Sequence, residues 1–221
     1  MKIAGYDLSM NGSGICILDL DENLDVVDCD YLGFTQVKKY EIEGHSIYYR
    51  KDDFDSRYAL TEMMIDEITK KTKDVSYVGI EDFAFGALGR LADIGSFVGQ
   101  VAYDSWKRGI ALKWYGPAIN KKFFTGKGTT DKIGMYNAFL EFDGIKPDIS
   151  YMPEPKDKGG VSPTSDIIDA FSLAKLLQTE LKIRKGILKI GELPKYRQEL
   201  FYQKKKKTLL DEDFVKHSQF G

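Results

Sequence analysis

The chain has 221 residues, of which 43% are hydrophobic and 13% aromatic, and its formal net charge at pH 7 is −2. This length suits one domain, or one domain with an extension, and the apolar content excludes a chain that is disordered throughout. The slight negative charge excludes a uniformly basic coat for nucleic acid.

The N-terminal sequence MKIAGYDL lacks the charged stretch and the long apolar run of a signal peptide, and no later apolar run approaches the roughly 20 residues of a membrane helix. We therefore expect a cytoplasmic protein with no membrane partner. Cys16 and Cys29 show neither a disulfide-framework pattern nor CxxC spacing, and His45 and His217 neighbour no cysteine. The sequence thus gives no support for a disulfide scaffold or a structural zinc site.

The first fifth of the chain predicts an antiparallel meander. Three β-compatible runs span residues 2–8, 13–19 and 25–35, and turn-rich residues 9–12 separate the first two. Residues 36–53 are polar and rich in tyrosine, so we expect a long loop or a hairpin extension there.

Helices and strands then alternate. Periodicity and turn residues predict helices at 57–71, 88–107, 117–124, 129–142 and 164–181, strands at 75–83 and 110–115, and a loop at 144–164. Three antiparallel strands followed by alternating helices and strands indicate an α/β fold with a mixed sheet flanked by helices.

The chain beyond residue 181 is basic. Between residues 182 and 207 only Glu192 and Glu199 oppose ten lysines and arginines. We expect a domain at 1–181 and a basic C-terminal extension at 182–221. The lysine run at 204–207 is consistent both with a solvated tail and with a surface that binds polyanions.

Four carboxylates stand at the ends of predicted buried elements: Asp7, Glu81, Asp166 and Asp169. Each has an ordinary explanation, since Asp7 could bond the turn after it, Glu81 could be a strand-end acid and Asp166 a helix cap. Asp169 lies in an otherwise apolar helix, where an unpaired charge would be costly. Asp166 and Asp169 are three residues apart and so share a helix face.

Together the four acids favour a site for hard divalent cations, Mg²⁺ or Mn²⁺, with two ions activating water against a phosphodiester. The constellation therefore suggests hydrolysis of nucleic acid.

Four segments carry a family resemblance: GYDLSMNGSG with Asp7, GIEDFAF with Glu81, KKFFTGKGTTDK, and SDIIDAFSLA with the two aspartates. In order and spacing they resemble the four blocks of the RuvC family of Holliday junction resolvases, over about residues 1–180. The resemblance implies an RNase H-like fold with a mixed five-stranded sheet. It also implies a metal-dependent endonuclease that acts as a homodimer on branched DNA.

The resemblance places roles on individual residues. Asp7, Glu81, Asp166 and Asp169 match the four metal ligands of the family. When Gly126 and Gly128 are aligned with its glycine pair, Lys121 and Lys132 fall on its two basic positions, and Lys132 would support charge at the phosphate. Lys122 and Lys127 are consistent both with DNA contacts and with ordinary surface charges.

The segment after Glu81 is the one that the family stacks on bases at the junction centre. Phe85, close to Arg90, is our candidate for that stacking, whereas we expect Phe83 in the core. Gly95 and Gly99 suit either a dimer interface or close packing on the sheet.

Three features depart from the family pattern: the turn after Asp7 lacks Pro-Gly, segment 36–53 is long, and the basic extension is additional. They resemble a phage-type member and leave the substrate open between four-way junctions and other branches such as forks, flaps and three-way junctions.

Three alternatives remain on sequence grounds. The first is an actin-like ATPase or sugar kinase, whose first strand also carries an aspartate before a Gly/Ser-rich hairpin. The others are a catalytically inert junction-binding protein and a non-specific RNase H or integrase-like nuclease.

Overall fold

The computed structural model describes residues 1–9, 12–36, 47–49, 57–82, 91–203 and 207–217. No described helix combines the length and the hydropathy that crossing a membrane requires.

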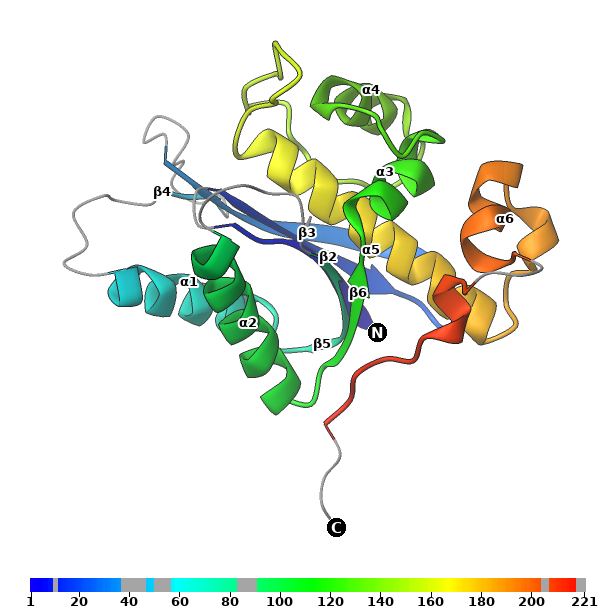
Figure 1. Cartoon of the computed structure of the whole chain (residues 1–221), viewed down its shortest axis with the longest axis horizontal. Helices are drawn as coiled ribbons and strands as arrows, with labels where there is room; N and C mark the ends of the chain where they lie inside the picture. The colour runs from blue at the N-terminus through cyan, green and yellow to red at the C-terminus, as the bar shows by residue number, and fades with distance from the viewer. Residues whose placement is uncertain (10–11, 37–46, 50–56, 83–90, 204–206, 218–221) are drawn as a thin grey trace.

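One six-stranded sheet, of order β4-β3-β2-β1-β5-β6, forms the centre of the structure (Figure 1). Its strands are β1 (Lys2–Asp7), β2 (Ser13–Leu20), β3 (Val26–Thr35), β4 (Ile47–Tyr49), β5 (Val75–Glu81) and β6 (Ala111–Tyr115). The first three strands form the predicted antiparallel meander, and β5 and β6 continue the sheet parallel to β1. This mixed sheet confirms the predicted α/β class.

The five predicted strands are joined by a sixth, β4, which lies in the segment where we expected a loop or a hairpin extension. β4 pairs with β3 in parallel, Gly33 opposite Ile47. Ile47 is buried, and the Tyr48 ring packs 5.8 Å from that of Phe34. A strand of three residues is too short to show alternation, so the sequence pattern did not reveal it.

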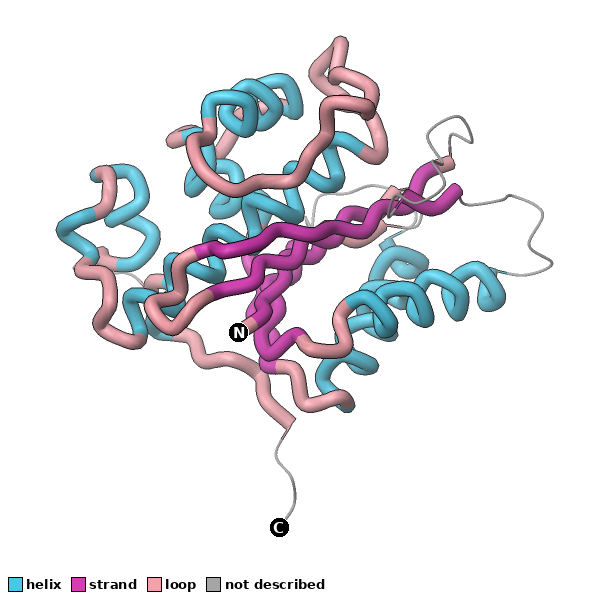
Figure 2. The backbone as a smooth tube through the Cα atoms, turned by 180° about the vertical axis from the view of Figure 1, so that it is seen from behind, coloured by secondary structure: helices cyan, strands magenta, loops and turns pink. Residues whose placement is uncertain are grey.

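Helices cover both faces of the sheet (Figures 1 and 2). They are α1 (Arg57–Lys71), α2 (Leu91–Lys107), α3 (Pro117–Thr125), α4 (Lys132–Glu141), α5 (Thr164–Arg184) and α6 (Lys195–Phe201). α1 and α2 bury Met64 and Phe97 against one face, together with Tyr6 of β1. α5 lies on the opposite face, where Phe171 and Leu173 enter a second core with side chains of α3 and α4.

Two predicted helix boundaries shift by more than one residue. α4 begins at Lys132, not at residue 129, because the Asp131 side chain caps it by accepting a hydrogen bond from the Gly134 N–H at 2.9 Å. α5 continues beyond the expected residue 181 to Arg184. Residues 83 and 88–90, included in the predicted strand and helix, lie outside the described residues.

Two glycines allow α5 to lie directly on the sheet. A Cβ atom on Gly5 of β1 would stand 2.1 Å from the carbonyl oxygen of Ala170, and one on Gly14 of β2 would stand 2.2 Å from that of Asp166. No side chain fits such a gap without displacing the helix. The glycines therefore bring the first turns of α5 against the end of β1.

Beyond α5 the described chain packs back onto the domain. Phe201 of α6 and Leu209 are buried in the core beneath α5. Val215 then lies along the outer edge of β6, where it exchanges two backbone hydrogen bonds with Leu112, at 3.0 and 2.9 Å.

A fully partnered carboxylate lies inside this region. Glu180 is completely buried; it accepts hydrogen bonds from the Tyr115 hydroxyl at 2.9 Å and Arg184 Nε at 2.8 Å, and its carboxylate lies 3.4 Å from Lys113 Nζ. Lys113 and Arg184 also donate to the Leu209 carbonyl, at 2.8 and 3.1 Å. We call Lys113, Tyr115, Glu180 and Arg184 the Glu180 network.

Candidate metal centre

Asp7 and Glu81 leave neighbouring strands at the same edge of the sheet. β1 and β5 are parallel, with Tyr6 opposite Ile80, so the next residue of each strand is one of the two acids. Side chains alternate between the faces of a sheet. Because Tyr6 and Ile80 enter the core under α1 and α2, Asp7 and Glu81 face α5.

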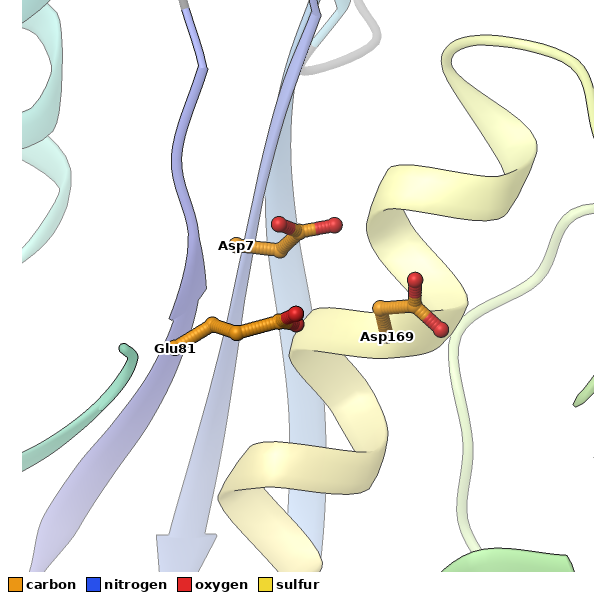
Figure 3. A group of neighbouring side chains, drawn as sticks. All are labelled: Asp7, Glu81 and Asp169. Atoms are coloured by element: carbon orange, nitrogen blue, oxygen red, sulfur yellow. The ribbon is translucent and has the colours of Figure 1, made fainter. Parts of the chain in front are cut away.

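Asp169 of α5 completes a group of three carboxylates. One oxygen from each of Asp7, Glu81 and Asp169 lies within 4.8 Å of the others, and Asp169 is buried (Figure 3). Three elements far apart in the sequence thus deliver acids to one point, as their positions predicted.

Asp166 lies beside this group but outside the 4.8 Å set. Its carboxylate is next to the turn after β1, where a Cβ atom on Gly12 would stand 2.6 Å from its Oδ2 atom. Asp166 is not the helix cap, since α5 begins after Pro163. Next to Asp166, the Ser9 hydroxyl donates to the Gly12 carbonyl at 2.6 Å and the Ser13 hydroxyl donates to the Ser9 carbonyl at 2.7 Å.

Lys132 supplies the cation of the cluster. It is the first residue of α4, and its ammonium group donates a hydrogen bond to Asp169 Oδ2. We expected it one turn further into the helix; its position at the N-terminus directs it to the carboxylates. Burial would lower the pKa of Lys132, but the charges of Asp169 and Asp7 outweigh burial and raise it.

The acids outnumber the cation, and their pKa values reflect this. Burial, reinforced by Glu81, raises the pKa of Asp7 well above its usual value. Burial and then Asp169 raise the pKa of Glu81 to about 7, although Lys132 and Lys121 oppose the shift. Burial also raises the pKa of Asp166, against a hydrogen bond from Ser162.

The donor set fits a hard divalent cation. All of its atoms are carboxylate oxygens, the ligands that Mg²⁺ and Mn²⁺ prefer. Within the described part of the chain, Asp166 Oδ2 and Asp169 Oδ1 are buried without a hydrogen-bond partner, an arrangement that is costly unless a cation satisfies it.

The other basic residues singled out from the sequence have different surroundings. Lys121 of α3 is close enough to Glu81 for its charge to lower the pKa of that acid. Lys122 points elsewhere and pairs with Glu199 of α6 at 2.6 Å. Lys127 is exposed in the turn between α3 and α4. Among the basic residues singled out from the sequence that the structure describes, Lys121 and Lys132 therefore approach the carboxylates.

Phe85 and Arg90, the residues predicted to lie at the junction centre, are outside the described residues, as are residues 204–206 of the lysine run. The helix with Gly95 and Gly99 is described from Leu91, and an added Cβ atom on Gly99 would meet nothing within 4 Å. Gly99 is therefore not in close packing against the described residues.

Asn120 is a supporting residue that sequence reasoning missed. It is buried on α3, its Nδ2 group donates to the Asp169 carbonyl at 3.3 Å, and its Oδ1 atom accepts from Ser172 Oγ at 2.6 Å. These bonds fix the turn of α5 that presents Asp169. The sequence pattern that could have revealed Asn120 is its position, as a polar residue, on the same helix face as Phe123 and Phe124.

No protein-family model matches the sequence, and no curated protein matches it. Among solved structures, a Thermus thermophilus RuvC structure is similar with a TM-score of 0.55 and 16% identity, over 85% of this chain and 98% of that chain. T. thermophilus RuvC in complex with a Holliday junction substrate gives a TM-score of 0.56 and 18% identity, over 85% and 97%.

The resemblance drawn from the four sequence blocks is thereby confirmed at the level of the fold. Along most of its length, this chain has the fold of RuvC.

Proposed function

We propose that this protein is a metal-dependent endodeoxyribonuclease that resolves Holliday junctions by paired phosphodiester hydrolysis. The observation that carries the proposal is the group of Asp7, Glu81 and Asp169, whose oxygens lie within 4.8 Å of one another in a chain with the RuvC fold. One of the similar structures was solved with a Holliday junction substrate.

In this proposal Asp7, Glu81, Asp166 and Asp169 hold Mg²⁺ or Mn²⁺, two ions in each active site. When bound, such ions lower the pKa of water and stabilise negative charge on the phosphate oxygens. The strands and α5 contribute rigidity, because a site built on packed elements holds its geometry better than one on loops.

Lys132 has a specific part in this scheme. Its ammonium group neutralises Asp169 in the metal-free protein. Once cations satisfy the carboxylates, the same group is free to contact a phosphate oxygen and to stabilise the charge that develops there. Lys121, near Glu81, adds positive charge on the same side.

DNA would be bound mainly through its phosphates, with Lys121, Lys122 and Lys127 as further contacts and Phe85 and Arg90 at the junction centre. Two cuts placed symmetrically call for two active sites, so we propose a homodimer. Affinity should fall steeply with salt, since phosphate contacts release counterions. Affinity that does not change with salt would contradict this account.

The test is cleavage of labelled four-way, three-way, forked and linear duplex DNA with Mg²⁺ or Mn²⁺, by wild type and Glu81→Gln. We expect paired nicks in the four-way junction that require metal and are lost in the variant, while junction binding persists. Glu62→Gln, an exposed acid of α1, is the matched control and should cut like wild type.

Other outcomes distinguish the alternatives. Equal cutting of all branched substrates would make the protein a broader debranching nuclease, and equal cutting of linear duplex would favour a non-specific nuclease. Junction binding without cleavage would indicate an inert binding protein. Nucleotide hydrolysis without cleavage would revive the actin-like ATPase, which the similarity to RuvC structures does not favour.

A further inference from the structure

A cavity of about 270 Å³ lies beside the second half of α5, whereas the carboxylates lie at its first turns. Its walls come from the second half of α5, from α3 and α6, from the residue after α4, and from the turn between β2 and β3. The charged residues around it are Asp25, Lys175, Lys182 and Arg197, and Phe123 and Phe142 are among its aromatic residues.

Three cations face one carboxylate in this cavity. Lys182 pairs with Asp25 at 2.5 Å. Lys175 donates to the Gln178 side chain, and Arg197 Nε donates to the Phe123 carbonyl at 2.9 Å. Within the described residues, neither Lys175 nor Arg197 forms an ion pair with a carboxylate. The cavity therefore carries an excess of positive charge that no described acid neutralises.

The surroundings of Lys175 agree with this imbalance. The side chain is largely buried, and its pKa is lowered to about 8 by burial and then by Lys182 and Arg197, with Cys29 and Asp25 opposing weakly. A buried ammonium group among like charges is stabilised when an anion enters.

Three aromatic rings, with Gln178, Thr179, Leu188 and Leu193, form the rest of the wall. The Arg197 guanidinium lies 4.4 Å from the Phe123 ring centroid, and the Lys175 amine lies 5.4 Å from that of Phe142. Phe124 continues the aromatic surface. The volume is just below the roughly 300–1,000 Å³ of typical ligand pockets, so it suits a ligand the size of one nucleotide. Aromatic faces beside cations are a combination that binds a base together with its phosphate.

We propose that this cavity binds a nucleoside 5′-phosphate, either free or as the terminal nucleotide of a DNA strand. The phosphate lies between Lys175 and Arg197, and the base lies against Phe142. Lys175 follows Asp169 by six residues, about 9 Å along α5, and none of the four candidate metal ligands lines the cavity. The site is therefore distinct from the metal centre and does not depend on the proposed nuclease activity.

The experiment is isothermal titration calorimetry with the full chain in EDTA, which prevents metal-dependent binding at the carboxylates. The probes are deoxyadenosine 5′-monophosphate and deoxyadenosine, and the proteins are wild type, Lys175→Gln and Lys195→Gln. Lys195 is exposed on α6, two residues before Arg197. Lys195→Gln therefore removes the same charge as Lys175→Gln, but outside the cavity. We expect one nucleotide bound per chain, affinity reduced about tenfold or more in Lys175→Gln, and wild-type affinity in Lys195→Gln.

Three results would overturn the proposal: no binding of the nucleotide at millimolar concentration, equal losses in the two lysine variants, or equal affinity for deoxyadenosine. If Lys175→Gln lacks a cooperative thermal transition, Arg197→Gln takes its place with the same expectation.

A second arm identifies the source of the nucleotide. Single-stranded oligonucleotides with a 5′-phosphate or a 5′-hydroxyl compete against the mononucleotide. Displacement only by the phosphorylated strand assigns the site to DNA ends, and displacement by neither strand assigns it to free nucleotides. Equal displacement by both strands would contradict recognition of the 5′-phosphate.

Discussion

Two groups of buried charge lie beneath α5, and their chemistry is opposite. In the Glu180 network the carboxylate has partners on every side: a hydroxyl, a guanidinium and an ammonium group. At the candidate metal centre four acids share mainly Lys132, and two of their oxygens have no partner within the described residues.

The difference separates structure from function. A charge that only holds the fold is neutralised by the chain itself, because an unpaired buried charge costs stability. Buried acids that the chain itself does not neutralise, in a well-packed domain, indicate a site for a ligand that the chain does not contain. The raised pKa values of Asp7 and Glu81 indicate the same site.

Removing one acid from the metal centre tests this difference most directly. We expect Asp7→Asn to reduce single-turnover junction cleavage by about 10³-fold or more. The free energy of unfolding in urea, measured without metal, should not fall, because the change relieves repulsion among like charges. Asp143→Asn, at an exposed position, is the control for both measurements. Retained cleavage in Asp7→Asn would remove that acid from the mechanism.

The same substitution type in the Glu180 network should have the reverse effect. Glu180→Gln leaves Lys113 buried without its carboxylate and should cost about 3–5 kcal/mol of unfolding free energy. Cleavage per folded molecule should stay near wild type. Glu141→Gln, an exposed acid of α4, should change the unfolding free energy by less than about 0.5 kcal/mol. A stable Glu180→Gln variant would show that the network is not structural.

Lys132 and Lys122 test which cations belong to the site. Lys132→Gln should slow cleavage by about 10²-fold, because its ammonium group lies among the carboxylates where phosphate charge would develop. Lys122→Gln should slow it no more than a few-fold, since that side chain pairs with Glu199 at the surface. Single-turnover rates at saturating enzyme separate these effects from DNA affinity. Similar rates for the two variants would argue against a special role for Lys132.

The smallest effect concerns stability and pH. Glu81 has a pKa of about 7 in the folded protein, above its ordinary value of 4.5. Its contribution to stability is therefore complete below pH 4.5 and is lost as pH rises through 7. The melting temperature without metal should fall over this range, and less so in Glu81→Gln. Mn²⁺ should restore stability above pH 7 more than below pH 5. A melting temperature independent of pH would contradict the crowding of these acids.

The sequence was informative where chemistry and local pattern coincide. Asp7 and Glu81 end apolar strands, and Asp169 interrupts an apolar helix, so their burial and their placement at one sheet edge followed from the pattern. The difference between Asp166 and Asp169 did not. Both share a helix face, and only the docking of α5 on Gly5 and Gly14 decides which of them meets the strand ends.

Other features depend on contacts between distant residues, which local patterns do not encode. Lys113 and Glu180 look like surface charges in the sequence, yet each is buried because the other is present. The cavity at Lys175 likewise forms only where α3, α5 and α6 come together. The sequence alone therefore does not indicate that Lys182 and Arg197 line it.

The pairing of Val215 with Leu112 has a consequence for handling the protein. β6 ends the sheet, and an uncovered outer strand offers its amide and carbonyl groups to any extended peptide. The C-terminal segment occupies part of that position, and Lys113 and Arg184 hold its carbonyl groups. A protein truncated before residue 207 would therefore expose β6 as an unpaired edge strand, which can pair with another copy of the chain. Its most visible defect would be aggregation during purification, which could be mistaken for a failure to act on DNA.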